Sequence, residues 1–151
     1  MPPRCRAVVV CDDIRQEVGN KLSAMGMYTE LIGFPAGEGP FGLSKLVAVF
    51  VIAGLRNLDE LKFRQTITLD PSPKTASPDT RPFAALKRAD ANLDEDNFAQ
   101  ILSPAVFEGP CTLIAKLELD IEGEIYPFEY RLRVVRGAPG ASSVVSSPSP
   151  N

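Results

Sequence analysis

The stretch that decides the fold is CTLIAKLELDIEGEIYPFEYRLRVV, residues 111–135. Apolar side chains occupy every second position of its first half: Leu113, Ala115, Leu117, Leu119 and Ile121. Its second half has the same alternation, at Tyr126, Phe128, Tyr130, Leu132 and Val134. Because successive side chains of a strand point to opposite faces, each half predicts a strand with one apolar face.

The two halves together predict a β-hairpin with a two-residue turn at Glu122-Gly123. This turn sets residue 121 opposite residue 124, so both apolar sets meet on one face, and a shift by one residue would turn one set to solvent. The same register places Lys116 opposite Glu129, an opposite-charge pair that contributes only tenths of a kcal/mol. It also places Pro127 at a position that is not hydrogen-bonded across the hairpin, where a missing N–H is tolerated at a sheet edge.

Further strands are expected at 4–11, 21–34, 44–55, 61–69 and about 98–107. Residues 44–55, SKLVAVFVIAGL, are apolar at both parities, which predicts a central strand covered on both faces. Residues 61–69 alternate, which predicts a strand with a basic, solvated outer face. Six or seven strands with at most one short helix predict an all-β antiparallel β-sandwich, Ig-like or C2-like, with a barrel of the same strands as the alternative.

The connecting segments are less regular. PAGEGP, 35–40, reads as a loop, and residues 70–92, which contain four prolines, read as a long excursion outside the core, more typical of an insertion than of a functional loop. Residues 93–103 are ambiguous between helix and strand, and at most one helical turn is expected at 93–97. Residues 137–151 are rich in Gly, Ser and Pro, so we expect one domain at 1–136 and a disordered tail.

The composition excludes several classes of function. The chain of 151 residues contains no histidine, so no catalytic triad, Cys-His pair or His-ligated metal site can be built from it. Its net charge of −3 argues against nucleic acid as a partner. The three cysteines, without CxxC spacing, predict reduced thiols, and no apolar run is long enough for a membrane span or signal peptide. We therefore expect a cytoplasmic protein without a cofactor.

A metal site is conceivable after the first strand. Asp12 and Asp13 could hold Ca²⁺ together with Glu17, but these carboxylates supply few of the six or more oxygens that Ca²⁺ takes. The favoured interpretation is that the two aspartates end the strand and bond the following turn. Residues 19–23, Gly-Asn-Lys-Leu-Ser, lack the GxxxxGK[ST] spacing of a phosphate loop and predict a hairpin turn instead.

The remaining acidic residues could supply the carboxylate pair of a glycosidase. They are Glu118, Asp120, Glu122 and Glu124, with Asp94, Glu95 and Asp96 elsewhere. Alternation explains the first four as a solvated strand face, which is the favoured interpretation. We expect no catalytic residues and no enzyme.

The pattern Cys11-Asp12-Asp13 followed by Gly19-x-Lys21-x-Ser23-x-x-Gly26-x-Tyr28 resembles an uncharacterised family of small bacterial and phage proteins. Residues 107–112, Phe-Glu-Gly-Pro-Cys-Thr, with the hairpin after them, are similar to the closing segment of that family. This chain departs from the pattern at Asn20, inserted after Gly19, and in the excursion 70–92. The resemblance implies a β-sandwich and carries no established activity or catalytic residues.

The function expected from the sequence is a non-enzymatic binding or structural module that meets a protein partner, or a second copy of itself, through loops or edge strands. A membrane partner is not expected. Two alternatives stay open: a Ca²⁺- or Mg²⁺-dependent module or hydrolase that uses clustered acids, and an accessory subunit of a phage or virion.

Overall fold

A computed structural model describes residues 2–19, 21–70 and 81–137. Over these ranges the chain is all-β, with eleven strands in three sheets and no helix. The strands are β1 (Arg4–Glu17), β2 (Lys21–Tyr28), β3 (Leu31–Phe34), β4 (Phe41–Leu43), β5 (Leu46–Ala53), β6 (Glu60–Asp70), β7 (Ala84–Lys87), β8 (Asp96–Leu102), β9 (Ala105–Phe107), β10 (Cys111–Ile121) and β11 (Glu124–Arg136). None of the described residues forms a helix that could cross a membrane.

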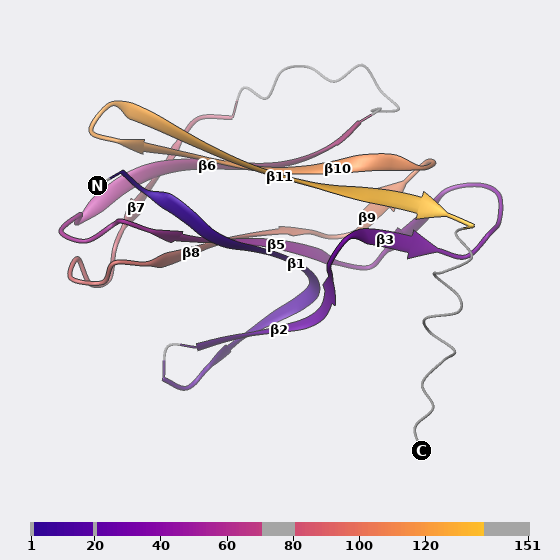
Figure 1. Cartoon of the computed structure of the whole chain (residues 1–151), viewed down its shortest axis with the longest axis horizontal. Coiled ribbons are helices and arrows are strands. Elements are labelled where there is room, and N and C mark those ends of the chain that lie inside the picture. Colours follow the sequence, from indigo (N-terminus) through magenta and orange to yellow (C-terminus); the bar gives the residue numbers. More distant parts are fainter. Residues whose placement is uncertain (1, 20, 71–80, 138–151) are drawn as a thin grey trace.

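Two larger sheets make up the body of the protein. One has the strand order β2-β1-β5-β8 and the other β3-β11-β10-β6-β7, while β4 and β9 form a separate pair. In Figure 1, β6, β10 and β11 form an upper layer above β1, β5 and β8, and β2 lies lower still. The two larger sheets therefore lie as stacked layers.

The predicted hairpin is confirmed. β10 and β11 pair antiparallel from Ile121↔Glu124 to Cys111↔Val134, and the expected Lys116↔Glu129 pair is present. Glu122 and Gly123 both have positive φ, 55° and 88°, as a tight two-residue turn requires. The side of β11 near Pro127 has no strand partner among the described residues, because β3 pairs only with residues 133–136. The missing N–H of Pro127 therefore interrupts no ladder.

The main core lies between the two larger sheets. Leu113, Ala115, Leu117 and Leu119 of β10 are fully buried there, opposite the even-numbered side chains of β5. Gln65 of β6 also points into this space, where its Nε2 donates to Phe98 O of β8 at 3.1 Å. A side-chain amide in an apolar core is tolerated when its polar atoms find partners, and here it links the two layers.

The prediction that 44–55 contains a strand covered on both faces is also confirmed. The even-numbered residues of β5, from Leu46 to Ile52, belong to the main core, and the odd-numbered Val47 and Val49 form a second buried cluster with Cys11. The second cluster lies on the outer face of the four-stranded sheet, where Val9 and Ile14 pack against it. Apolar residues at both parities of β5 thus reflect burial of each face in a different hydrophobic cluster.

Several predictions about strand number and direction are wrong. Within the described ranges there are eleven strands, not six or seven, because short strands such as β4, β7 and β9 carry too few residues to show a period. The expected strand 21–34 is two strands, β2 and β3, which belong to different sheets. β3 pairs parallel to β11, so the pairing is not purely antiparallel. β1 passes through Asp12 and Asp13 to Glu17, so the aspartates do not end it.

The excursion 70–92 also differs from expectation, and the structure shows the ambiguous segment after it to be strand. Within the first, β7 pairs with β6, so its described part contributes a strand to the sheet, while 71–80 lies outside the described residues. The second contains no helical turn, which the expectation of at most one turn allows, and its expected strand is present as β8 and β9, separated at a cis Ser103-Pro104 peptide. The expected disordered tail 137–151 falls outside the described residues except for Gly137, whose N–H donates to Phe34 O at 2.9 Å.

Candidate functional site

The residues predicted as a site lie on a hairpin arm, defined here as residues 12–28. Its two strands pair along their length, from Cys11↔Met27 to Glu17↔Lys21. Figure 1 shows β1 curving so that β2 lies beneath β5 and β8 of the same sheet. Ile14, Leu22 and Ala24 of the arm line an apolar hollow of about 260 Å³ together with side chains of β1, β5 and β8. The arm therefore folds back over the outer face of the sheet to which it belongs.

Asp12 lies where this curvature begins. The Tyr28 hydroxyl donates to Asp12 Oδ1 at 2.5 Å. Burial, followed by this hydrogen bond to a carboxylate, raises the pKa of Tyr28 above its ordinary value. Gly26, with φ of 68°, lies directly against the same carboxylate. Asp12 of β1 thus contacts two residues of β2 and holds the two strands of the arm together.

Asp13 has different partners. Lys45 Nζ donates to its Oδ1 at 2.6 Å, and the backbone N–H of Ile14 donates to the same atom at 2.9 Å. The hydrogen bond from Lys45 is the largest cause that lowers the pKa of Asp13 below its ordinary value, because it favours the ionised carboxylate. This ion pair ties the arm to the residue that precedes β5.

Glu17 lies near the arm's tip, where Ser23 Oγ donates to its Oε1 at 3.1 Å. The three predicted carboxylates therefore each have a separate protein partner, and the structure does not bring them together. Within the described ranges, no group of three or more acidic or cysteine side chains is placed to hold a metal ion. The turn expected near residue 19 is present, with Gly19 at φ of 86°, while Asn20 lies outside the described residues.

The carboxylates considered for glycoside hydrolysis are distributed over several environments. Glu118 accepts from Arg64 at 2.9 Å, and the guanidinium also stacks on Phe83, 4.6 Å from the ring centroid. Glu124 accepts from the Tyr126 hydroxyl at 2.8 Å, and this hydrogen bond raises the pKa of Tyr126. These two acids are engaged in structural contacts.

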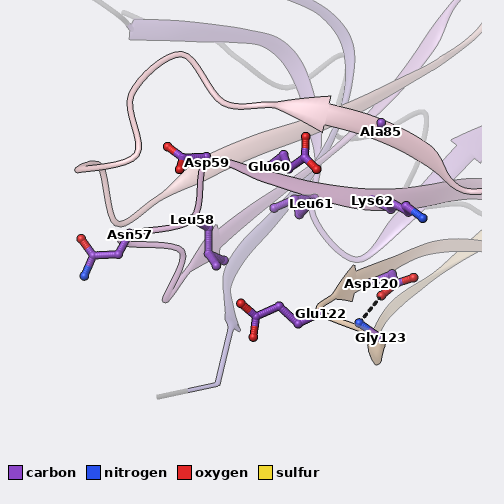
Figure 2. Close-up of a pocket in the computed structure, with 10 residues that line it drawn as sticks. All are labelled: Asn57, Leu58, Asp59, Glu60, Leu61, Lys62, Ala85, Asp120, Glu122 and Gly123. Atoms are coloured by element: carbon purple, nitrogen blue, oxygen red, sulfur yellow. Dashed lines mark hydrogen bonds between the residues drawn. The ribbon is translucent and has the colours of Figure 1, made fainter.

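Asp120 and Glu122 line an acidic hollow of about 510 Å³ beside the β10–β11 turn, together with Asp59 and Glu60 from the start of β6 (Figure 2). Figure 2 shows Asp120 turned toward Gly123, whose N–H donates to it at 3.0 Å. The described residues that line the hollow supply no hydroxyl, thiol or aromatic side chain. A sugar-binding cleft would need an aromatic or hydroxyl-bearing wall to orient a substrate, and this hollow has neither.

Sequence reasoning missed Arg88. Its guanidinium, only 1% exposed, donates to three backbone oxygens, Leu55 O, Leu58 O at 3.2 Å and Leu93 O at 2.7 Å. It also pairs with Asp96 at 3.3 Å. These acceptors come from the β5–β6 and β7–β8 connections, so Arg88 joins two loops at one end of the molecule. All of its described partners are structural, and no period or spacing in the sequence marks it.

Exposed apolar side chains are spread over strand edges and over the arm. The larger ones include Val18, Met25 and Met27 on the arm, Ile101 on β8, Val106 on β9 and Ile125 on β11. Among the four strands that end the two larger sheets, β8 has the longest continuous register: all seven residues pair with β5 on one side, and no described strand pairs with the other. Among these end strands, β8 therefore has the longest regular open edge.

No family model, curated protein or solved structure matches this chain.

Proposed function

We propose that this chain is a non-enzymatic protein-binding module, built as an Ig-like or C2-like β-sandwich, that meets its partner through an edge strand. The observation that carries the proposal is the free side of β8. Residues 97–102 contain no charge, proline or glycine, and Ile101 is 53% exposed. An unpaired strand of this kind presents backbone N–H and C=O groups that a partner strand can satisfy.

The chemistry of the described acids supports a binding role over catalysis. Asp12, Asp13 and Glu17 each hold a structural hydrogen bond, and the acidic hollow of Figure 2 is lined by carboxylates and the Lys62 amine, without a hydroxyl or thiol among its described residues. The absence of histidine removes the commonest general base. A scaffold of this kind acts through what it contacts.

The test is affinity capture from an extract of the cells that make the protein, followed by mass spectrometry. Two baits are compared with the wild type: Ile101→Lys, which places a charge on the β8 edge, and Val106→Lys, a matched change at a side chain of similar exposure, 54%, on β9. We expect Ile101→Lys to lose a partner that Val106→Lys retains. Retention of every partner by Ile101→Lys would refute the edge as the binding site.

A further inference from the structure

The other open edges each carry a feature that opposes strand addition. The stretches of β6 and β11 without a second described strand partner, 64–70 and 124–132, both contain charged residues, and the stretch of β11 also contains Pro127. β3 and β7 have only four residues each, and β7 ends at Lys87. β2 begins at Lys21 and is kinked by Gly26 at positive φ. Short edges, lysine and local irregularity are the means by which natural sheets avoid pairing with other chains. β8 has none of them between Asn97 and Leu102, so it is the edge prepared for a partner.

β8 also carries a buried acceptor without a partner. Gln100 Oε1 is inaccessible to solvent and accepts no hydrogen bond from the described residues. A buried amide oxygen left unpaired costs about 1–3 kcal/mol, so such atoms normally have a donor. The strand that could bring one is the strand that β8 lacks on its free side.

We infer that β8 pairs with β8 of a second copy of this chain, antiparallel and about a two-fold axis at Gln100, which joins the two four-stranded sheets. This inference rests on the proposed function and names its partner. In that register the two Gln100 side chains are directly opposite each other, with Cβ atoms about 4.5–5.5 Å apart. When the Gln100 amide turns toward the free side, its buried Oε1 becomes accessible, and each N–H₂ can donate to the Oε1 of the other copy.

The same register matches the remaining side chains by kind. Ala99 meets Ile101 on the outer face, and Phe98 meets Leu102 on the core face, so apolar residues oppose apolar residues. Moving the axis by one residue to Ala99 would set Asp96 against Leu102 and leave Gln100 facing Phe98. The axis at Gln100 is therefore the one that satisfies both the amide and the apolar pairs.

Charge does not oppose this contact between identical chains. The acids next to the edge are Asp96, paired with Arg88 at 3.3 Å, and Glu95, paired with Arg6. In an antiparallel pair about Gln100, the two Asp96 residues lie at opposite ends of the ladder, about 27 Å apart at roughly 3.4 Å per residue. Like charges thus stay separated, and isologous pairing needs no second kind of surface.

The experiment is sedimentation equilibrium on the full chain. We expect a reversible dimer whose Kd rises at least about tenfold in Ile101→Lys and is unchanged in Val106→Lys. Register is tested by mild oxidation. Gln100→Cys should form a covalent dimer, because identical residues face each other there, while Ala99→Cys and the wild type with its native cysteines should not.

The outcomes separate this inference from the proposed function. A wild type that stays monomeric at high micromolar concentration, or a dimer that Ile101→Lys leaves intact, overturns the self-pairing. If that monomer still captures a partner that Ile101→Lys loses, only the self-pairing falls, and the edge belongs to a different protein. If capture is also unaffected, both proposals fall. Circular dichroism of each variant verifies that it is folded.

Discussion

Gly26 lies so close to Asp12 that a Cβ atom at position 26 would be 2.3 Å from the carboxylate Oδ2. Gly26 also has φ of 68°, a conformation that disfavours any residue with a Cβ. Glycine is therefore needed at this position twice, once for the backbone and once for the space that Asp12 occupies. The curvature of the arm depends both on the positive φ of Gly26 and on the space that its missing Cβ leaves for Asp12.

Gly26→Ala should destabilise the protein more than Gly123→Ala. Both glycines have positive φ, which costs an alanine about 1–2 kcal/mol, but a Cβ at Gly123 meets no atom within 4 Å. At Gly26 the Asp12 carboxylate must also move away from Tyr28, which adds about 1 kcal/mol or more. Urea unfolding of the two variants measures the difference, and equal losses would contradict the role of the Asp12 contact.

Arg88→Met should lower the free energy of unfolding by about 3–5 kcal/mol, because it leaves buried carbonyl oxygens of two connections and the Asp96 carboxylate without their donor. The matched control is Arg131→Met, which removes an exposed ion pair with Glu129 and should cost less than about 1 kcal/mol. Chemical denaturation measures both. Similar losses in the two variants would show that Arg88 does not hold the connections together.

The β10–β11 hairpin could be predicted to the residue because its determinants are local. Alternation fixes which side chains face the core, and Glu122-Gly123 fixes the turn, so Lys116 opposite Glu129 follows from the sequence alone. The two-sided burial of β5 could be predicted for the same reason. The residues that bury the outer face of β5 could not be predicted, since they come from a distant part of the chain.

The candidate site was harder to predict because its features depend on three-dimensional context. Asp12-Asp13 has the composition of a strand end, and only the contact with Gly26 shows that β1 continues and bends there. The burial of Arg88 depends on carbonyl groups from two connections, one before β6 in the chain and one after β7, which the fold brings together. A local pattern records neither the neighbour that permits a bend nor the acceptors that permit a buried charge.

Addition of Ca²⁺ or Mg²⁺ at millimolar concentration should leave the melting temperature unchanged. An ion that binds only the folded state must raise it, and Asp12, Asp13 and Glu17 are engaged with three different partners. Thermal unfolding with metal, and again with a chelator, measures the effect. A rise that disappears in Asp13→Asn would contradict the prediction and place a metal on the arm.

The stability that Tyr28 contributes should be lost at alkaline pH. Burial and the hydrogen bond to Asp12 raise the pKa of Tyr28 in the folded state, so folding favours the protonated phenol. The contribution is then fully present below the pKa of tyrosine in the unfolded chain, about 10, and declines as the pH rises above it. The difference in free energy of unfolding between the wild type and Tyr28→Phe should therefore shrink above about pH 10.

Asp12→Asn is the matched control, because it removes the negative charge but keeps the phenol. In that variant the ultraviolet absorbance of tyrosinate, corrected by the Tyr28→Phe spectrum, should appear at lower pH than in the wild type. If Tyr28 ionises at the same pH with and without the carboxylate, the hydrogen bond does not hold its proton, and another contact must fix the arm.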